Sequence, residues 1–167
     1  MTASVQHRPT VLDATVLSNV AYLDAVSLLT SLDRPVTKPT VQAELTRGTD
    51  RYPYLARATE ALSKTIPVVE LTDETQRLAA QFTDRLDRGE AEALAVADYR
   101  HGLIATDDGA ARAMARDYAI PFTGTIGILV DLVEDGLVTE QTADSWLKQL
   151  VDDIDYYAPS RHLSEYL

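Results

Sequence analysis

Apolar residues in this chain form short runs that are separated by stretches with a helical period. Five short apolar or extended runs occur, at residues 10–14, 34–39, 66–71, 103–106 and 121–123. Between them, apolar residues recur every three or four positions, which places them on one face of a helix. Short strands that alternate with helices predict an α/β domain with a mostly parallel sheet.

Turn and capping residues indicate where the predicted helices begin and end. Thr, Asp and Asn side chains accept hydrogen bonds from the free N–H groups of a first helical turn, and glycine often follows a last turn. The segment 91–97 is apolar apart from Glu92, so we expect the helix around it to be largely buried. We expect helix caps at Thr40, Asp73 and Asp108, a helix over 125–134, a helix start at Thr139, and helix ends at Gly102 and Gly136.

Length and composition predict one folded domain. The 167 residues are 46% hydrophobic, which is enough apolar material for a core. We expect a single domain over 1–167, with a core at 10–138 and C-terminal helices at 139–167 packed on it. The chain has no cysteine, which excludes disulfides, thiol catalysis and cysteine-based zinc sites. No apolar run approaches the roughly 20 residues of a membrane span, and the first residues do not resemble a signal peptide, so we expect a cytoplasmic location.

The chain is strongly acidic, with 26 Asp and Glu against 15 Lys and Arg and a formal net charge of −11. Aspartate outnumbers glutamate and lysine is scarce, a composition typical of proteins that stay soluble at high salt. Such a charge repels nucleic acid at long range. The excess is uneven, because residues 121–167 contain nine acidic and two basic residues. The acidity alone therefore counts against nucleic-acid binding, but much of it lies in the C-terminal quarter.

Five acidic residues fall where a parallel sheet places a ligand site. Ligands bind beyond the carboxyl ends of the strands in such sheets. Carboxylates that converge there repel one another, and a divalent cation relieves the repulsion. Oxygen-only ligands suit Mg²⁺ or Mn²⁺, which can activate water for attack on a phosphodiester. The candidates are Asp13 and Asp107 at strand ends, Glu44 early in a helix, and Glu90 and Glu92 at the start of the apolar helix.

Most of these residues also have a simpler interpretation. Asp13 suits a helix cap, Glu44 suits a solvated helix position, and Glu90 suits a helix N-terminus, where the dipole favours negative charge. Glu92 is harder to explain in this way because its neighbours are alanine and leucine. Residues i and i+2 of a helix lie about 200° apart, so Glu90 and Glu92 cannot point the same way.

Five segments, in order and with natural spacing, resemble the PIN-domain superfamily. They are VLDATVLSN (11–19), VQAEL (41–45), RGEAEALAVA (88–97), LIATDDGAARAMA (103–115) and FTGTIGIL (122–129). The VapC-like prokaryotic branch, with its GExEA helix and TGTxGxL turn, is the most similar. The resemblance implies a three-layer α/β/α sandwich around a short sheet, and a metal-dependent ribonuclease. Proteins of this kind are often homodimers and often the toxin of a toxin–antitoxin pair.

The acidic positions of the family carry over to Asp13, Glu44 and Asp107, and to one of Glu90 and Glu92. The glycine–glutamate pair favours Glu90, whereas the acid-Ala-x-x-Ala pattern favours Glu92, so both stay open. The resemblance thus implies that Asp13, Glu90 or Glu92, and Asp107 hold Mg²⁺ or Mn²⁺, with Glu44 as a further catalytic residue. The alternative is a PIN fold that binds RNA or a protein partner without catalysis.

Polar and basic residues near these positions are candidates for substrate contact. Thr15, Asn19 and Thr106 could orient a metal-bound water or a carboxylate, although local capping explains Thr15 equally well. Arg112 and Arg116 are four residues apart, hence on one face of a predicted helix, and are candidates for contact with the phosphates of single-stranded RNA. In so acidic a chain, each arginine is equally a candidate for a salt bridge.

Overall fold

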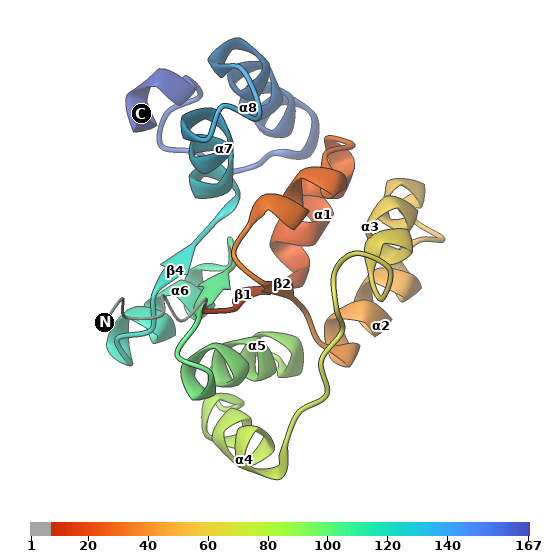
Figure 1. Ribbon diagram of the computed structural model, residues 1–167, viewed down its shortest axis with the longest axis vertical. Coiled ribbons are helices and arrows are strands. Elements are labelled where there is room, and N and C mark those ends of the chain that lie inside the picture. Colours follow the sequence, from red (N-terminus) through yellow and green to blue (C-terminus); the bar gives the residue numbers. More distant parts are fainter. Residues whose placement is uncertain (1–7) are drawn as a thin grey trace, which may run out of the picture.

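A computed structural model describes residues 8–167 of the chain, and within them four short parallel strands form one sheet. The strands are β1 (Thr10–Leu12), β2 (Pro35–Val36), β3 (Leu103–Ala105) and β4 (Phe122–Thr123), in the order β2-β1-β3-β4 (Figure 1). Val11 of β1 pairs with Val36 on one side and with Ile104 on the other. The two central strands therefore end side by side.

Helices occupy most of the rest of the described chain. The α-helices are α1 (Ala14–Tyr22), α2 (Pro39–Gly48), α3 (Ala56–Ala61), α4 (Asp73–Phe82), α5 (Arg88–Tyr99), α6 (Gly109–Asp117), α7 (Thr125–Glu134) and α8 (Glu140–Ile154), and the 3₁₀ helices are η1 (Val26–Ser31), η2 (Pro53–Leu55) and η3 (Leu163–Tyr166). None of the helices within residues 8–167 combines the length and the apolar character that a membrane crossing needs.

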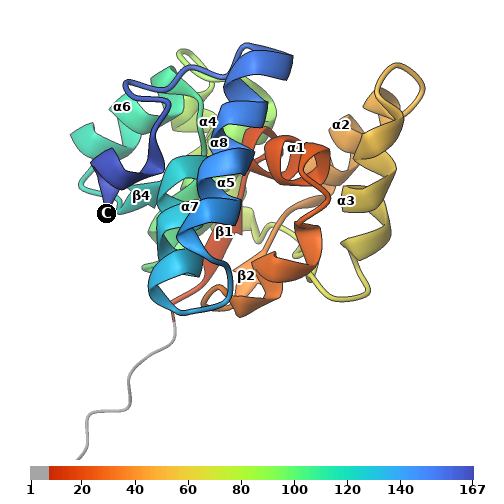
Figure 2. The same ribbon diagram turned by 90° about the horizontal axis from the view of Figure 1, so that it is seen from above.

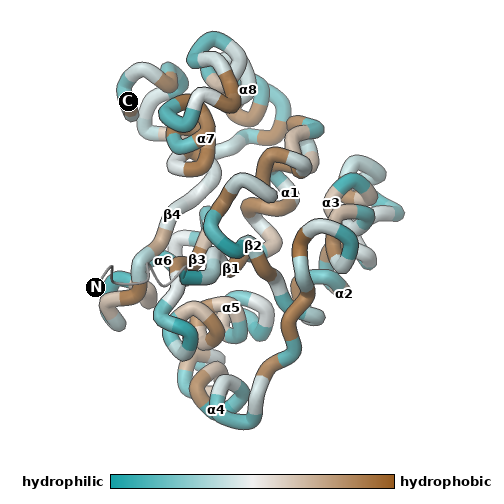
Figure 3. Tube along the Cα trace, viewed as in Figure 1, coloured by the Kyte–Doolittle hydropathy of each residue, from teal (hydrophilic) through white to brown (hydrophobic). Residues whose placement is uncertain are grey.

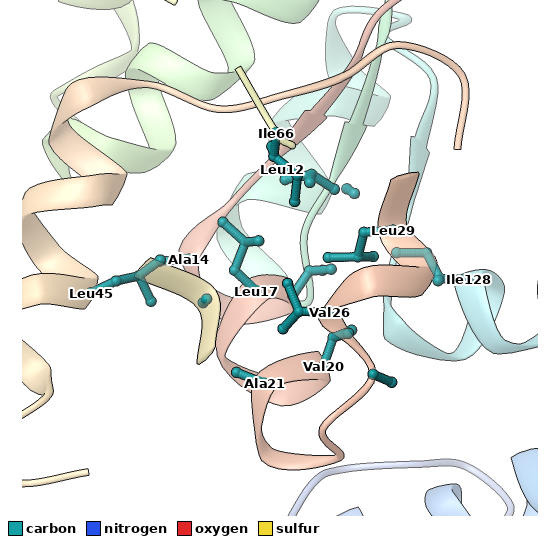
Figure 4. Close-up of a cluster of buried hydrophobic side chains, with 14 of the residues drawn as sticks. Leu12, Ala14, Leu17, Val20, Ala21, Val26, Leu29, Leu45, Ile66 and Ile128 are labelled. Atoms are coloured by element: carbon teal, nitrogen blue, oxygen red, sulfur yellow. The ribbon is translucent and has the colours of Figure 1, made fainter. Parts of the chain in front are cut away.

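Helices cover both faces of the sheet. Successive side chains of a strand point to opposite faces, and in this sheet apolar side chains on each face pack against helices. Leu12 of β1 packs in a cluster with Leu17 of α1 and Ile128 of α7 (Figure 4). Val11 points the other way, into a cluster that includes Leu94 of α5. Figure 1 shows α1 and α7 on one side of the strands and α4 and α5 on the other. The predicted three-layer α/β/α arrangement is confirmed.

Hydropathy along the chain follows these layers. Hydrophobic patches occur on α1, α5 and α7, and hydrophilic stretches occur on α8 (Figure 3). The residues of α5 from Ala91 to Ala97 are all buried, as the apolar segment there predicts. Burial of a Leu or Val side chain contributes about 1.5–3 kcal/mol, so α5 is a principal source of stability on its face.

A third cluster joins α7 to the C-terminal part of the chain. Leu129 of α7, Ala143 and Leu147 of α8, and Leu163 of η3 are its buried members. Figure 2 shows α8 alongside α7 and the C-terminal segment beside β4 and α6. This packing returns residues 156–166 to the carboxyl ends of β3 and β4.

The predicted strand at 66–71 is wrong, because this segment does not join the sheet. Val68 forms an isolated parallel bridge to Thr37, beside β2. Pairing goes no further for two reasons: Pro67 has no N–H to donate, and the partner segment enters α2 at Pro39.

Two of the expected helix starts are confirmed and one is displaced. Asp108 caps α6 and Thr139 caps α8, and each side chain accepts a hydrogen bond from the N–H three residues later. The cap of α4 is Thr72 rather than Asp73, which lies in the first turn. The Asp73 carboxylate there still benefits from the positive end of the helix dipole.

The expected cap of α2 at Thr40 is also wrong. Helix α2 begins at Pro39, two residues before the start that a cap at Thr40 implies, and Lys38 occupies the cap position. Proline suits the first position of a helix because its φ is already helical and it has no N–H to leave unpaired. The hydroxyl of Thr40 is therefore free to donate a hydrogen bond to the carboxylate of Glu92.

Candidate active site

The ends of β1 and β3 bring the first acidic candidate against its neighbours. Asp13 follows β1 directly and is only 2% exposed. Its carboxylate accepts a hydrogen bond of 2.8 Å from the hydroxyl of Thr106, which follows β3. Asp13 stands at the cap position of α1, but its side chain makes no cap hydrogen bond within the described residues. Burial raises the pKa of Asp13 above its usual range. Because the side chain makes no cap hydrogen bond, helix capping does not account for this buried carboxylate.

A buried lysine lies among the carboxylates. Lys38 has no exposed surface, and its ammonium donates a hydrogen bond of 2.7 Å to the carbonyl of Gly89. Burial lowers the pKa of Lys38 to about 8, against the opposing effect of nearby negative charges. Those charges belong to Glu92, Asp13, Asp87 and Glu44. A charged group is costly to bury unless opposite charges surround it, so these carboxylates and Lys38 stabilise one another.

Glu44 lies at the open side of this group. A cavity of about 590 Å³ is lined by Glu44 and Asp87 together with residues of α2 and the start of α5. A Cβ on Gly89 would lie 3.5 Å from an oxygen of Glu44 and 3.7 Å from an oxygen of Asp87, so the two carboxylates flank the same glycine. Partial burial, followed by the charges of Asp87 and Asp13, raises the pKa of Glu44. Glu44 therefore belongs to the carboxylate group.

Glu90 and Glu92 point to different neighbours, as their spacing predicts. Glu90 forms a capping box with Asp87 at the start of α5. Burial and then the charges of Asp108, Asp87 and Asp13 raise the pKa of Glu90 to about 7. Glu92 is 7% exposed and accepts hydrogen bonds from Arg88, at 3.0 Å, and from Thr40.

The interpretation of Glu90 as a helix-start residue is confirmed by its capping box, and the charges of other carboxylates act on it as well. Among the negative charges that raise the pKa of Lys38, that of Glu92 has the largest effect. The choice between the two as a metal ligand stays a prediction.

Asp107 is held at the N-terminus of α7 by neutral donors. Its carboxylate accepts hydrogen bonds from the side-chain amide of Asn19 at 2.9 Å, from the backbone N–H of Thr125 at 2.9 Å and from the hydroxyl of Tyr156 at 3.0 Å. The Thr125 hydroxyl donates to it as well. The free N–H groups at the start of a helix favour an anion, and here the anion is the protein's own.

The backbone around Asp107 is fixed too. Its N–H donates to the hydroxyl of Thr15 at 3.0 Å. A Cβ on Gly124 would lie 2.5 Å from an oxygen of Asp107 and 2.9 Å from the guanidinium of Arg112, which explains a glycine at this position. The neighbouring Asp108 caps α6 and is the negative charge that acts most strongly on Glu90. Asp107 therefore lies on the α7 side of the site, and its role as a metal ligand stays a prediction.

Comparison with known families identifies this arrangement. A family model described as "DUF3368: PIN domain" matches residues 9–167. The chain belongs to the PIN-domain family DUF3368. Searches of curated proteins and of solved structures gave no significant match. The resemblance to PIN domains is thus confirmed for the family, while kinship with the VapC-like branch stays a prediction.

The donor atoms of this PIN domain suit a hard divalent cation, but they are not gathered around one point. Asp13, Glu44 and Glu90 carry pKa values raised by burial and by neighbouring carboxylates, a crowding that a cation would relieve. Within residues 8–167, no three His, Asp or Glu side chains lie close enough together to hold one ion. Ligation by three of them therefore requires their side chains to move.

The arginines of this PIN domain divide into paired and available groups. Arg88 forms a salt bridge with Glu92, and Arg85 lies 3.8 Å from Asp117. Arg112 and Arg116 lie over the ring of Phe122, with their guanidinium carbons 5.1 Å and 5.4 Å from its centroid. Cation–π contact leaves the edges of a guanidinium open for further hydrogen bonds. Contact of Arg112 and Arg116 with a phosphate stays a prediction.

Three residues of the site, Asp87, Lys38 and Tyr156, are not among the residues predicted from the sequence. Of these, Asp87 has a local signal, because an aspartate three residues before Glu90 fits a capping box. Lys38 and Tyr156 have none, since their partners lie 51 and 49 residues away in the chain. Such contacts appear only once the chain is folded.

Proposed function

We propose that this PIN domain is a divalent-metal-dependent endoribonuclease that acts on single-stranded RNA. The observation that carries the proposal is the crowding of Asp13, Glu44, Asp87 and Glu90 at the carboxyl ends of the central strands of a PIN fold. Burial, and after it the charges of neighbouring carboxylates, raises the pKa values of Asp13, Glu44 and Glu90, and groups perturbed in this way occur at functional sites. Membership of a family typical of nucleases supports the same reaction.

The residues that would hold Mg²⁺ or Mn²⁺ are Asp13, Glu90 or Glu92, and Asp107, with Glu44 beside them. A bound ion would activate water and stabilise the charge that develops on the phosphodiester. The hydrogen bond from Thr106 orients the Asp13 carboxylate, and Asn19 orients that of Asp107. Ligands held in this way lose less conformational entropy on binding.

Positive charge near the site would bind the substrate. Arg112 and Arg116 lie on one face of α6, and Arg112 lines the same cavity as Asp107. Each would neutralise a phosphate of the RNA backbone, a contact that positions the strand without reading its sequence. Because the chain as a whole is acidic, we expect activity to require enough salt to screen its surface.

The test is cleavage of labelled RNA by purified protein with Mn²⁺, in low- and high-salt buffers. We expect cleavage of single-stranded RNA that leaves a 5′-phosphate and a 3′-hydroxyl, and its loss on addition of EDTA. Asp13→Asn should reduce the rate at least 100-fold, on the scale of losses that follow removal of a group that stabilises transition-state charge. Asp24→Asn, which changes an exposed aspartate, is the matched control.

Three outcomes would contradict the proposal. If RNA is not cleaved at any salt concentration with Mn²⁺, the domain is not a nuclease of this kind. If RNA binds without cleavage, and calorimetry detects no Mn²⁺ binding, the catalytically inactive PIN module is the better description. Cleavage by Asp13→Asn at the wild-type rate would trace the activity to a contaminant.

The partners implied by the VapC-like resemblance are proposals with their own measurements. A toxin should arrest growth when expressed in a salt-adapted host, and co-expression of an antitoxin should restore growth. A homodimer should sediment at twice the 18.3 kDa mass of the chain. Neither result depends on the other, and neither depends on which glutamate binds metal.

A further inference from the structure

A second cavity opens on the α7 side of the site. Its volume is about 770 Å³, within the range of pockets that hold a small organic ligand. It lies between α6, β4, α7 and the segment that follows α8, which Figure 2 shows close together. Asp107 lines it, so this cavity borders the carboxylate group directly.

The walls of the cavity are rich in aromatic rings. Phe122 of β4, Tyr156 and Tyr157 after α8, and Tyr166 of η3 all line it. Tyr157 is 84% exposed, the largest exposure among the large hydrophobic residues of the described chain. An aromatic ring so exposed gains almost nothing from the core, and its position on the wall of a cavity suits it to pack against a ligand.

Positive charge borders these rings, beside the carboxylates of Asp107 and Asp131, which also line the cavity. Arg112 lines the cavity, and both Arg112 and Arg116 lie over the Phe122 ring. Neither forms an ion pair closer than 4.0 Å with an acidic side chain in the part of the chain that the structure describes. A pocket that offers aromatic faces beside available guanidinium groups matches a nucleotide, whose base stacks and whose phosphate is anionic.

The position of the cavity indicates which nucleotide of an RNA strand it would bind. Asp107 is tied on one side to Asn19 of α1, the helix that begins just after Asp13, and on the other to Tyr156 on the cavity wall. A strand whose phosphate lies at the carboxylates therefore has its neighbouring nucleotide within reach of the cavity. We propose that this cavity binds one base of single-stranded RNA next to the cleaved phosphate, by stacking on Tyr157, with Arg112 and Arg116, which lie over the ring of Phe122, on the adjoining phosphates.

The inference rests on the proposed function only for the identity of the strand, so binding is measured apart from cleavage. The probe is fluorescein-labelled single-stranded RNA of mixed sequence, followed by anisotropy with the Asp13→Asn protein in EDTA. Stacking contributes about 1–3 kcal/mol per base, so Tyr157→Ala should weaken binding roughly 5- to 150-fold. Tyr99→Ala is the matched control, because Tyr99 is exposed but lies at the end of α5 and does not line the cavity.

A second RNA, with one abasic nucleotide placed in turn along the strand, tests contact with a base. When the protein has Tyr157, the RNA that is abasic at one particular position should bind more weakly than intact RNA. When the protein carries Tyr157→Ala, the same abasic RNA and intact RNA should bind equally well. Circular dichroism melting establishes that Tyr157→Ala remains folded, as a change at an exposed position should.

The outcomes separate this inference from the proposed function. RNA that is cleaved normally but bound equally by Tyr157→Ala and the control overturns the inference and leaves the nuclease intact. RNA that is bound through Tyr157 but never cleaved supports the cavity and contradicts the nuclease. Absence of RNA binding at every salt concentration overturns the inference, and absence of cleavage with Mn²⁺ as well overturns both.

Discussion

The carboxylates on the two sides of the candidate site are stabilised in different ways. On the α5 side, the negative charges of Glu92, Asp13 and Glu44 act on the buried ammonium of Lys38. On the α7 side, Asp107 has neutral donors instead, from Asn19, Thr125 and Tyr156. A buried anion is stabilised by an opposite charge or by hydrogen-bond donors. The α5 side has both, because Thr106 and Thr40 donate to Asp13 and Glu92, whereas the partners of Asp107 are neutral donors. Substitutions that remove a charge should therefore reduce stability most on the α5 side, and substitutions that disturb the packing should do so on the α7 side.

The largest effect is expected at Lys38. Lys38→Met should destabilise the metal-free protein by up to about 3–5 kcal/mol, because it leaves buried carboxylates without their cation. Urea unfolding in EDTA measures the change. Lys64→Met, at an exposed lysine, is the control and should stay within about 0.5 kcal/mol of the parent. Equal stability of both variants would show that Lys38 does not compensate these charges.

Gly124→Ala tests the shape of the α7 side. The new Cβ would lie 2.5 Å from an oxygen of Asp107, so the carboxylate must move. Overpacking of this kind costs about 1–3 kcal/mol. In Gly109→Ala, the Cβ meets nothing within 4 Å among the described residues, and stability should be unchanged or slightly raised. Thermal unfolding of the pair measures the contrast, and a Gly124→Ala protein as stable as Gly109→Ala would contradict the packing around Asp107.

Tyr156→Phe removes one donor to Asp107 and leaves the ring in place. A hydrogen bond to a charged group contributes about 1.5–3 kcal/mol, so the free energy of unfolding should fall by an amount near the lower figure. Tyr22→Phe removes an exposed hydroxyl that donates to Asp153 at 2.8 Å, and it should cost less. The comparison fails if the two losses in urea unfolding are equal.

The smallest effect concerns pH and belongs to the α5 side. The pKa of Glu90 is raised to about 7, so the folded state holds a proton that the unfolded state releases near pH 4.5. Between these values, the stability of the metal-free protein should fall as pH rises. Glu90→Gln should flatten this slope, seen as a difference of roughly 2–4 °C in Tm across the window. An unchanged slope would mean that Glu90 is not the group responsible.

The sequence predicts the parts of this structure that depend on neighbouring residues. The strands that start near Thr10 and Leu103 and the caps at Asp108 and Thr139 are signalled by local apolar runs and capping side chains. Asp13 is predicted at a strand end because strand and helix periods change there. These features need only a few consecutive residues.

The remaining features depend on distant parts of the chain. The segment 66–71 is apolar enough for a strand, but whether it pairs depends on the length of its partner, which Pro39 ends. Lys38 is indistinguishable from a surface lysine until α5 packs over it. Likewise, Asp107 has the spacing of a ligand, but its orientation is set by Tyr156, far along the chain.

Lys38 also has a consequence for how the site behaves in salt. Mobile ions screen charges on the surface, at a Debye length of about 10 Å in 0.1 M salt, but they do not enter the space around a side chain with no exposed surface. The surface aspartates therefore depend on the surrounding electrolyte for their counter-ions, whereas the buried carboxylates of Asp13 and Glu92 have a positive charge nearby that is part of the chain. When the salt concentration changes, the screening of the surface charges changes with it, while the interaction of Lys38 with these two buried carboxylates stays nearly the same.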